Sequence, residues 1–229
     1  MTSSKEFFLL FIKKEKVAKN TYSFYFDRSH VNYDFRPGQY NRMILPHDNP
    51  DERGTSRFFT VVSSPLEKDY LVITTKIVRS TFKKKLASLI PGDKVKFFGP
   101  MGNLVLLDDE KESLVLLAGG MGITPFRSML TYAGVKKLNS KITLLASFSA
   151  AEEMVFHEEL VKIANERPTI KVVYATKSPE ELVKEYIKDV QQSKYYVVGP
   201  PEMVDVARQM LESLRVPEEK IVTESFIDY

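Results

Sequence analysis

The chain of 229 residues contains no cysteine and no tryptophan, and it has only three histidines. The absence of cysteine excludes disulfides, thiolate-bound iron–sulfur clusters, thiolate zinc sites and cysteine nucleophiles. The histidines, His30, His47 and His157, are scattered along the sequence, so we expect no metal site. A cysteine-free chain is also compatible with a reducing cytoplasm, which is the location we expect.

The sequence also lacks long apolar runs and a strong net charge. The apolar run from Phe7 to Ile12 is far shorter than the roughly 20 residues that a membrane helix needs, so no membrane span is expected. A formal net charge of +3 does not indicate a nucleic-acid-binding protein. Lysine-rich stretches do occur at residues 13–16, 83–85 and 136–137. They are either solvated surface or a docking face for an acidic redox partner or an anionic cofactor.

Residues 1–104 show short β-rich runs separated by turn signals, and a helix is indicated at Phe82–Leu89 by its apolar spacing. The expected strands are Phe7–Ile12, Thr21–Phe26, Gln39–Leu45, Arg57–Val62, Leu71–Val78 and Lys94–Phe98. Such a series predicts a six-stranded antiparallel Greek-key β-barrel domain.

Residues 105–229 alternate apolar strand-like runs with helical segments. The expected strands are Leu114–Ala118, Ile142–Phe148, Ile170–Ala175, Tyr195–Val198 and Ile221–Thr223, with helices near 125–138, 152–165, 179–190 and 201–214. Continuous apolar runs are typical of strands covered on both faces. This half therefore predicts a five-stranded parallel, doubly wound α/β nucleotide-binding domain.

A glycine-rich loop, Gly119-Gly120-Met121-Gly122-Ile123-Thr124-Pro125, follows the first strand of this second half. Glycines permit a tight turn and close approach of a ligand to the backbone. We expect Thr124 to cap the next helix and Pro125 to occupy its first position, leaving free N–H groups for a phosphate. Arg127 in the first helical turn indicates that an anion lies nearby.

A second loop, Val198-Gly199-Pro200-Pro201-Glu202-Met203, follows the fourth strand. If the first and fourth strands are neighbours, both loops meet at the point where strand order reverses, which is where open α/β sheets bind ligands. Neither loop has the G-x-G-x-x-G pattern, so each could also be a plain tight turn.

Taken together, four segments resemble the ferredoxin–NADP⁺ reductase superfamily over nearly the whole chain. They are Arg57-Phe58-Phe59-Thr60, the loop 119–125, Gly199-Pro200-Pro201 and the terminal Glu224-Ser225-Phe226-Ile227-Asp228-Tyr229. The resemblance implies a barrel that holds FAD, with FMN the weaker choice, and NADH or NADPH as co-substrate.

The resemblance also implies the roles of individual residues. Arg57 would pair with flavin phosphates, Phe59 would stack on the flavin ring and Thr60 would hydrogen-bond its reactive edge. The full set of implied flavin-binding residues is Arg57, Phe58, Phe59, Thr60, Val62, Ser63, Lys76, Val78, Ser80, Thr81, Phe82, Lys83 and Phe226. The implied dinucleotide-binding residues are Gly119, Gly120, Gly122, Ile123, Thr124, Pro125, Ser147, Gly199, Pro200, Pro201 and Met203. The implied catalytic residues are Thr60, Glu224, Phe226 and Tyr229.

The chain departs from the family pattern at several positions. Phe59 replaces the usual tyrosine, Val198 replaces a frequent cysteine, and Ser80-Thr81-Phe82-Lys83 replaces the usual pyrophosphate-binding pattern. The segment after the second α/β strand, Ser147-Phe148-Ser149, has no arginine for a 2′-phosphate and therefore favours NADH.

We expect an NAD(P)H-dependent flavoprotein reductase that passes electrons from the flavin to a protein or small-molecule acceptor. The alternative is a non-catalytic flavin- or nucleotide-binding subunit of a larger complex. The sequence identifies neither the acceptor nor the oligomeric state.

Overall fold

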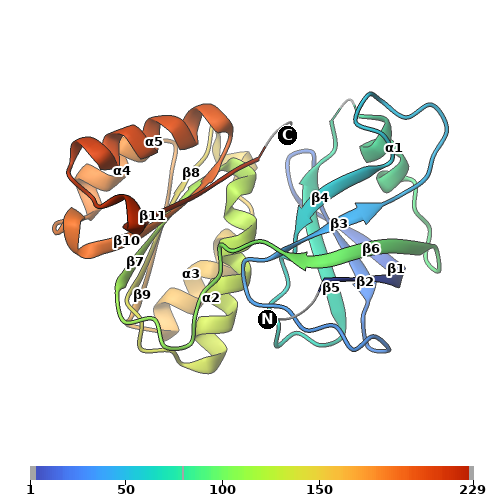
Figure 1. Ribbon diagram of the computed structural model, residues 1–229, viewed down its shortest axis with the longest axis horizontal. Coiled ribbons are helices and arrows are strands. Elements are labelled where there is room, and N and C mark those ends of the chain that lie inside the picture. Colours follow the sequence, from blue (N-terminus) through green and yellow to red (C-terminus); the bar gives the residue numbers. More distant parts are fainter. Residues whose placement is uncertain (1–3, 79, 227–229) are drawn as a thin grey trace.

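The protein has two domains that lie side by side (Figure 1). The computed structural model describes residues 4–78 and 80–226. An antiparallel six-stranded sheet ends at Met101, and a parallel five-stranded sheet begins at Ser113. The predicted combination of a β-barrel and a doubly wound α/β domain is confirmed.

The first domain is built from six antiparallel strands in the order β4-β3-β6-β1-β2-β5. They are β1 (Lys5–Ala18), β2 (Thr21–Asp27), β3 (Tyr40–Ile44), β4 (Ser56–Thr60), β5 (Tyr70–Lys76) and β6 (Lys94–Met101). The Val62 N–H, just after β4, donates to the carbonyl of Val72 in β5 at 2.8 Å, which joins the two edges of the sheet. Helix α1 (Thr81–Ala87) buries Phe82 in the same core.

Alternation along β1 explains how this barrel fills its interior. Phe7, Leu9 and Phe11 point inward and are almost fully buried, whereas Phe8 and Leu10 point outward and are exposed. Successive side chains of a strand face opposite sides of the sheet, so this pattern follows directly from the sequence.

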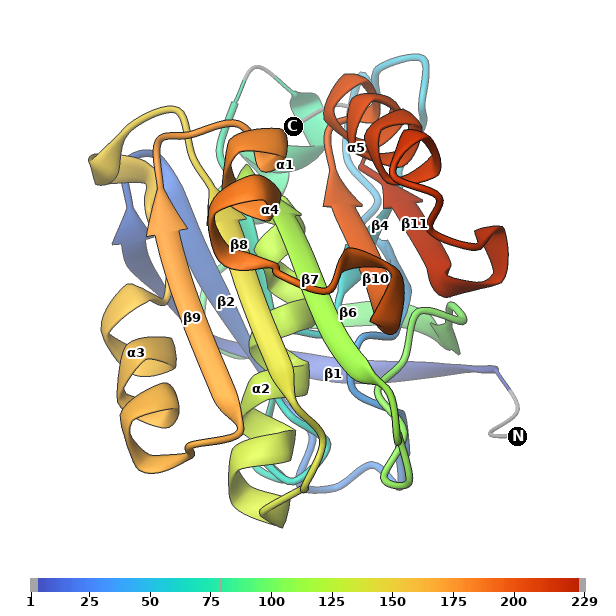
Figure 2. The ribbon, with the colours of Figure 1, turned by 90° about the vertical axis from the view of Figure 1, so that its left-hand side faces the viewer.

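The second domain is a parallel sheet in the order β11-β10-β7-β8-β9. Its strands are β7 (Ser113–Gly119), β8 (Ile142–Ser147), β9 (Ile170–Ala175), β10 (Ser193–Gly199) and β11 (Ile221–Ser225). Helices α2 (Thr124–Lys136) and α3 (His157–Glu166) cover one face, and α4 (Pro179–Tyr186) and α5 (Pro201–Ser213) cover the other (Figure 2). After β9 the chain crosses to β10, so strand order reverses between β7 and β10.

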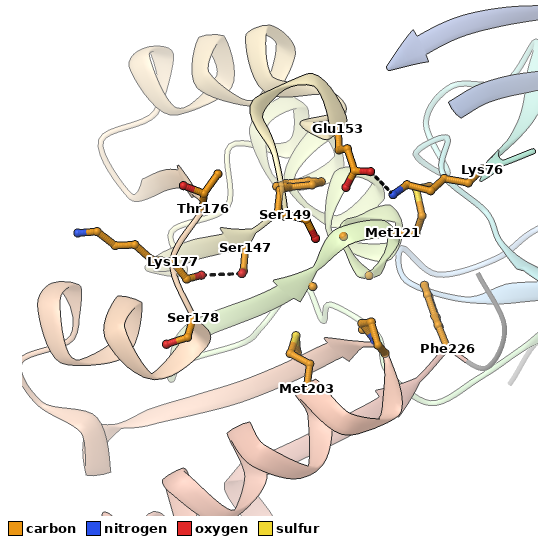
Figure 3. Close-up of a pocket in the computed structure, with 16 residues that line it drawn as sticks. Lys76, Met121, Ser147, Ser149, Glu153, Thr176, Lys177, Ser178, Met203 and Phe226 are labelled. Atoms are coloured by element: carbon orange, nitrogen blue, oxygen red, sulfur yellow. Dashed lines mark hydrogen bonds and ion pairs between the residues drawn. The ribbon is translucent and has the colours of Figure 1, made fainter. Parts of the chain in front are cut away.

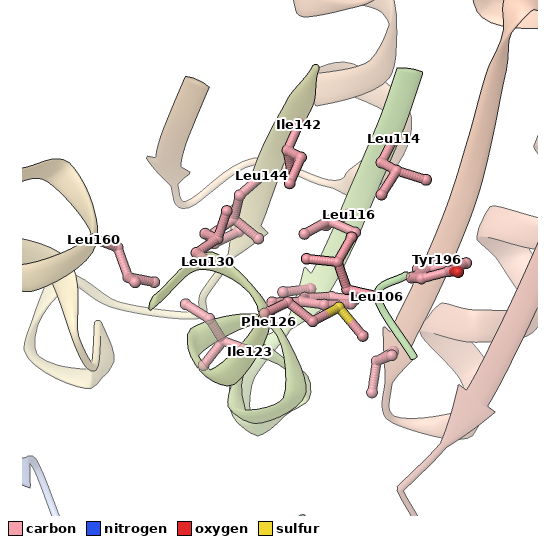
Figure 4. Close-up of a cluster of buried hydrophobic side chains, with 14 of the residues drawn as sticks. Leu106, Leu114, Leu116, Ile123, Phe126, Leu130, Ile142, Leu144, Leu160 and Tyr196 are labelled. Atoms are coloured by element: carbon pink, nitrogen blue, oxygen red, sulfur yellow. The ribbon is translucent and has the colours of Figure 1, made fainter. Parts of the chain in front are cut away.

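Both faces of this sheet are covered by apolar side chains. Leu114 and Leu116 of β7 pack with Phe126 of α2 (Figure 4). Their neighbours Val115 and Leu117 pack on the opposite face, with α4 and α5. Two buried faces require apolar residues at every position, which accounts for the unbroken run in β7.

Helix α2 lies at the junction of the two domains. The guanidinium of Arg127 donates to the Val62 carbonyl at 3.1 Å and to carboxylate oxygens of Glu67 in the barrel and Glu159 in α3. Ser128 also donates to the Ser63 carbonyl at 2.9 Å. The anions expected beside Arg127 are therefore two carboxylates of the protein. Among the described helices, none is both long and apolar enough to cross a membrane.

Candidate functional site

The two glycine loops meet at the switch point of the parallel sheet. β7 and β10 are direct neighbours, with Ala118 opposite Val198. A Cβ atom on Gly122 would lie 2.0 Å from the Val198 carbonyl oxygen, so only glycine permits this approach. Gly120 has φ +51°, and the space that its Cβ would occupy is open. The two loops therefore pack tightly against each other at Gly122 and leave open space for a ligand at Gly120.

A cavity of about 480 Å³ opens in front of these loops. Most of its lining follows the carboxyl ends of β7, β8, β9 and β10, and Lys76 joins it from the barrel (Figure 3). The lining residues are Lys76, Gly119, Gly120, Met121, Gly122, Ser147, Phe148, Ser149, Glu153, Thr176, Lys177, Ser178, Gly199, Pro200, Met203 and Phe226. This first cavity occupies the place where open α/β sheets bind ligands.

The start of α2 differs from the prediction. Residues Gly120–Ile123 form a 3₁₀ helix that continues into α2, and Ile123 occupies the cap position. The hydroxyl of Thr124 donates to the Met121 carbonyl at 2.9 Å, so it does not accept a backbone N–H as a cap would. The prediction that Thr124 caps the helix is therefore wrong, because the helical turn already begins within the glycine loop.

A second cavity of about 750 Å³ lies between β4 and the end of β11. Its lining residues are Tyr40, Arg53, Ser56, Arg57, Phe58, Phe59, Thr60, Lys83, Gly102, Asn103, Leu104, Val222, Thr223, Glu224, Ser225 and Phe226. The Tyr40 and Phe58 rings pack edge to face with centroids 5.7 Å apart. Phe58 is 59% exposed, whereas Phe59 is 5% exposed and packs beside Phe82.

Phe226 belongs to the lining of both cavities. Its backbone N–H donates to the Gly199 carbonyl at 2.8 Å, which ties the segment after β11 to the second glycine loop. In the first cavity it lies at one end, with Thr176 and Lys177 at the other (Figure 3). A ligand in each cavity would therefore approach the other at Phe226.

Lys76 at the end of β5, which the resemblance places on the pyrophosphate side of the flavin, lines the first cavity and not the second. Its ammonium group pairs with the Glu153 carboxylate at 2.8 Å, and both side chains are about a quarter exposed (Figure 3). The strand ends beside the domain junction, so the long side chain reaches the α/β domain. The barrel thus contributes a cation to the cavity in front of the glycine loops.

Glu224 brings an ionisable group into the second cavity. Burial raises the pKa of its carboxyl to about 7, because removal from water penalises the charged form. Burial also raises the pKa of Tyr40, and the charge of Glu224 adds to this increase. The carboxyl of Glu224 therefore loses its proton at a higher pH than an ordinary glutamic acid does.

The guanidinium of Arg57 is held by neighbouring protein groups. It pairs with the Asp51 carboxylate, and it donates to the carbonyls of Arg53 at 3.0 Å and of Ser56 at 2.7 Å. The hydrogen bond from Arg57 holds the pKa of Asp51 below its usual value. Arg57 lies at the second cavity, as predicted, and a phosphate there would compete with Asp51 for it.

Several other predicted residues lie outside both cavities: Val62, Ser63, Val78, Ser80, Thr81, Phe82, Ile123, Thr124, Pro125 and Pro201. The Val62 N–H donates to Val72, and the carbonyls of Val62 and Ser63 accept from Arg127 and Ser128; their predicted place along a flavin edge stays a prediction. Ser80 caps α1, where its hydroxyl accepts from the Lys83 N–H. Tyr229 lies outside the described residues.

The sequence interpretation missed the residues that follow β9. Thr176, Lys177 and Ser178 line the first cavity, and the Ser147 hydroxyl donates to the Lys177 carbonyl at 2.6 Å. Their position directly after a parallel strand could have predicted this, because the carboxyl ends of all central strands converge at one edge of the sheet. No comparable sequence pattern places Tyr40 in the second cavity.

Models of two protein families match this chain. The oxidoreductase FAD-binding domain matches residues 9–106, and the oxidoreductase NAD-binding domain matches residues 116–209.

Curated proteins with similar sequences include one component of the Na⁺-translocating NADH-quinone reductase of Marinomonas sp. (strain MWYL1). It is 29% identical over 77% of this chain and 46% of its own length. The plasma membrane-associated coenzyme Q6 reductase PGA3 of Saccharomyces cerevisiae is 28% identical over 86% of this chain and 68% of its own length. The chain thus spans about half the length of its relatives from Na⁺-translocating reductases.

Solved structures share the fold. The Amycolatopsis cytochrome P450 reductase GcoB superposes with a TM-score of 0.85 at 19% identity, covering 97% of this chain and 70% of that one. The ferredoxin–NADP⁺ reductase from Plasmodium falciparum superposes with a TM-score of 0.78 at 17% identity, covering 96% of both chains.

Proposed function

Because this chain belongs to the ferredoxin–NADP⁺ reductase superfamily, we propose that it is an NADH-dependent flavoprotein reductase that passes electrons to a separate acceptor. FAD is its cofactor and NAD(P)H its co-substrate. The observation that carries the proposal is the contact between the two cavities at Phe226. Hydride transfer requires two rings to lie roughly 3–3.5 Å apart, which displacement of the Phe226 ring from this shared wall would allow.

The second cavity suits FAD in size and in chemistry. Its volume of about 750 Å³ lies within the range of small-molecule sites, which are commonly apolar with a few polar groups. Tyr40 and Phe58 supply aromatic surface for a flat ring system, and Thr60 supplies a hydroxyl. Arg57 supplies a cationic fork suited to a phosphate. These residues would hold the cofactor between the barrel and β11.

The bound FAD would supply the redox chemistry, taking up a hydride and releasing electrons singly or in pairs. The protein holds and orients the cofactor and the dinucleotide, and it excludes water from them. Thr60 orients a polar edge in the second cavity, and Glu224 holds or releases a proton at its carboxyl near neutral pH. Phe226 covers the wall between the cavities until the nicotinamide end of the dinucleotide takes its place.

The first cavity favours NADH over NADPH. A 2′-phosphate commonly needs cations around it. Among the described residues no arginine lines this cavity, and both of its lysines already face carboxylates. Lys76 pairs with Glu153, and Lys177 pairs with Glu185 at 2.5 Å.

The acceptor class we propose to test first is a quinone. Two similar curated proteins are named as reductases of quinone and of coenzyme Q6. The alternative acceptors are an acidic redox protein, such as ferredoxin or flavodoxin, and free flavin.

An anaerobic titration of the purified chain tests the proposal. We expect a yellow protein with flavin absorbance that one equivalent of NADH bleaches, at lower concentrations than NADPH does. A soluble quinone analogue, ferredoxin and free flavin, each added in turn, should then distinguish the acceptors by the rate at which the colour returns. A flavin spectrum that neither dinucleotide changes would instead support a non-catalytic flavin-binding subunit.

A further inference from the structure

One outer surface of the barrel exposes large apolar side chains. Phe8 and Leu10 on β1 are 48% and 43% exposed, and Ile90 in the turn between α1 and β6 is 65% exposed. This turn lies against β1, because the Gly92 N–H donates to the Phe11 carbonyl at 2.9 Å. The three side chains therefore belong to one region, although the barrel core uses none of them.

Lysines surround these apolar side chains. Lys94 pairs with Leu10 across the strands, and its ammonium lies 4.5 Å from the centre of the Phe8 ring. Lys14 reaches the Ala87 carbonyl at the end of α1, which brings the exposed Lys84 and Lys85 of that helix to the same region. We call Phe8, Leu10, Lys14, Lys84, Lys85, Ile90 and Lys94 the basic–apolar patch.

The acidic side chains near the patch do not cancel its charge. Glu6 pairs with Lys96 at 2.8 Å, and Glu15 pairs with Lys13 at 2.7 Å. Asp93 accepts the Ile90 N–H within the turn, and Asp27 lies opposite Leu10 on β2, where it accepts hydrogen bonds from Ser29. The four lysines of the patch therefore exceed the two remaining carboxylates.

We propose that the basic–apolar patch docks this protein on the surface of a bilayer that contains anionic lipids. Juxtaposed lysines and apolar side chains bind such surfaces, since the lysines meet the lipid phosphates while the apolar groups enter the headgroup region. Ile90 stands at a turn whose neighbours Pro91 and Gly92 are also exposed, which suits insertion into a soft layer. A second copy of the chain bound at the patch would bring lysines of like charge together. An acidic protein bound there would gain little binding energy from contact with the protruding Ile90.

Docking by this patch has a geometric consequence. α1 and the start of β6 lie on the side of the barrel away from the parallel sheet (Figure 1). Lys84 and Lys85 face outward from α1, while Lys83 of the same helix is buried at the second cavity. One helix, about 10 Å across, thus separates the patch from this cavity. The inference does not depend on the acceptor or on the dinucleotide.

Vesicle sedimentation of the flavin-loaded full chain tests the inference. We expect binding to vesicles of phosphatidylcholine with 30% phosphatidylglycerol, and at least tenfold weaker binding to phosphatidylcholine alone. The double substitution Lys84→Gln and Lys85→Gln should lower the partition coefficient about 25-fold, and Ile90→Ser about tenfold. The matched controls are Lys162→Gln with Lys184→Gln, and Val135→Ser, at exposed positions of the other domain. These controls should bind like the unsubstituted chain.

Three outcomes would overturn the inference. Failure of the unsubstituted chain to bind anionic vesicles is the first. The second is equal binding by the lysine and Ile90 variants, measured on proteins whose circular dichroism matches the unsubstituted chain. The third is a dimer in analytical ultracentrifugation that Ile90→Ser abolishes while vesicle binding is absent, which would assign the patch to a second copy of the chain.

Discussion

Arg127 in α2 donates hydrogen bonds to both carboxylate oxygens of Glu67 in the barrel, with N–O distances of 2.5 and 3.1 Å. The same guanidinium also bonds Glu159 of its own domain, so one side chain connects three elements. The hydrogen bonds and charges of the two carboxylates outweigh the effect of burial and raise the pKa of Arg127. This cluster is one of several polar contacts between the two domains, alongside the Lys76–Glu153 ion pair.

Arg127→Met should destabilise the protein by about 2–3 kcal/mol, because it leaves two carboxylates facing each other without their shared cation. Urea unfolding measures this change. Arg208→Met is the matched control, since Arg208 pairs with Glu212 on the exposed surface of α5 and such a pair contributes only about 0.3–0.5 kcal/mol. Equal losses in the two variants would contradict a special role for the junction.

Lys76→Met should raise the KM for NADH about tenfold and leave kcat almost unchanged. Loss of the lysine leaves the Glu153 carboxylate unpaired, and this carboxylate then repels the phosphates of the dinucleotide equally in the ground and transition states. Steady-state kinetics at two ionic strengths measure the effect. Lys19→Met is the control, because Lys19 also crosses the domain junction, to Glu152, but does not line the first cavity. A change in kcat alone would argue against a role of the Lys76–Glu153 pair in dinucleotide binding.

Glu224→Gln should flatten the dependence of stability on pH. The carboxyl has a pKa raised from 4.5 to about 7 in the folded protein, so folding favours its protonated form. Its contribution is complete below pH 4.5 and is lost as the pH rises to 7, amounting to about 2 kcal/mol after allowance for partial exposure. Urea midpoints from pH 4.5 to 8 should show this loss in the unsubstituted chain and not in the variant.

Gly122→Ala should destabilise the switch point by about 3 kcal/mol or more, because the new methyl group would overlap the Val198 carbonyl. Gly92→Ala is the control: its Cβ would meet open space, and only the cost of φ +96° applies. Thermal unfolding compares the two. A smaller loss for Gly122→Ala than for Gly92→Ala would show that β7 and β10 separate easily.

Phe226→Ser should lower the KM for NADH several-fold, because no ring then has to be displaced from the wall between the cavities. Stopped-flow bleaching by NADH and NADPH would reveal the change in affinity and in coenzyme preference. Identical bleaching in the variant and the unsubstituted chain would remove Phe226 from any gating role.

The periodicity of the sequence predicted most of the fold. Runs such as Leu114–Ala118 and Ile142–Phe148 became β7 and β8 because strands buried on two faces need continuous apolar residues. The helix expected at 152–165 instead begins at His157, after Phe156 adopts a left-handed φ of +61°. No glycine or proline marks that break, so tertiary packing must impose it.

The candidate site was less predictable. The glycine content of the two loops predicted a ligand site there. The position of Lys76 in the first cavity could not be predicted, because the sequence does not show which domain the end of β5 faces. The orientations of Phe58 and Phe59 in β4 could not be predicted either. Adjacent residues of a strand point in opposite directions, and the sequence alone does not reveal that Phe58 faces outward while Phe59 joins the core.

Helix α2 begins at the glycine loop of the first cavity and carries Arg127 and Ser128 against the barrel. A shift of the barrel would therefore move that loop, and the reverse also holds. If α2 transmits such shifts, the binding of the two ligands is thermodynamically linked. If an occupied barrel tightens the grip on the dinucleotide by some factor, the dinucleotide must tighten retention of the flavin by the same factor.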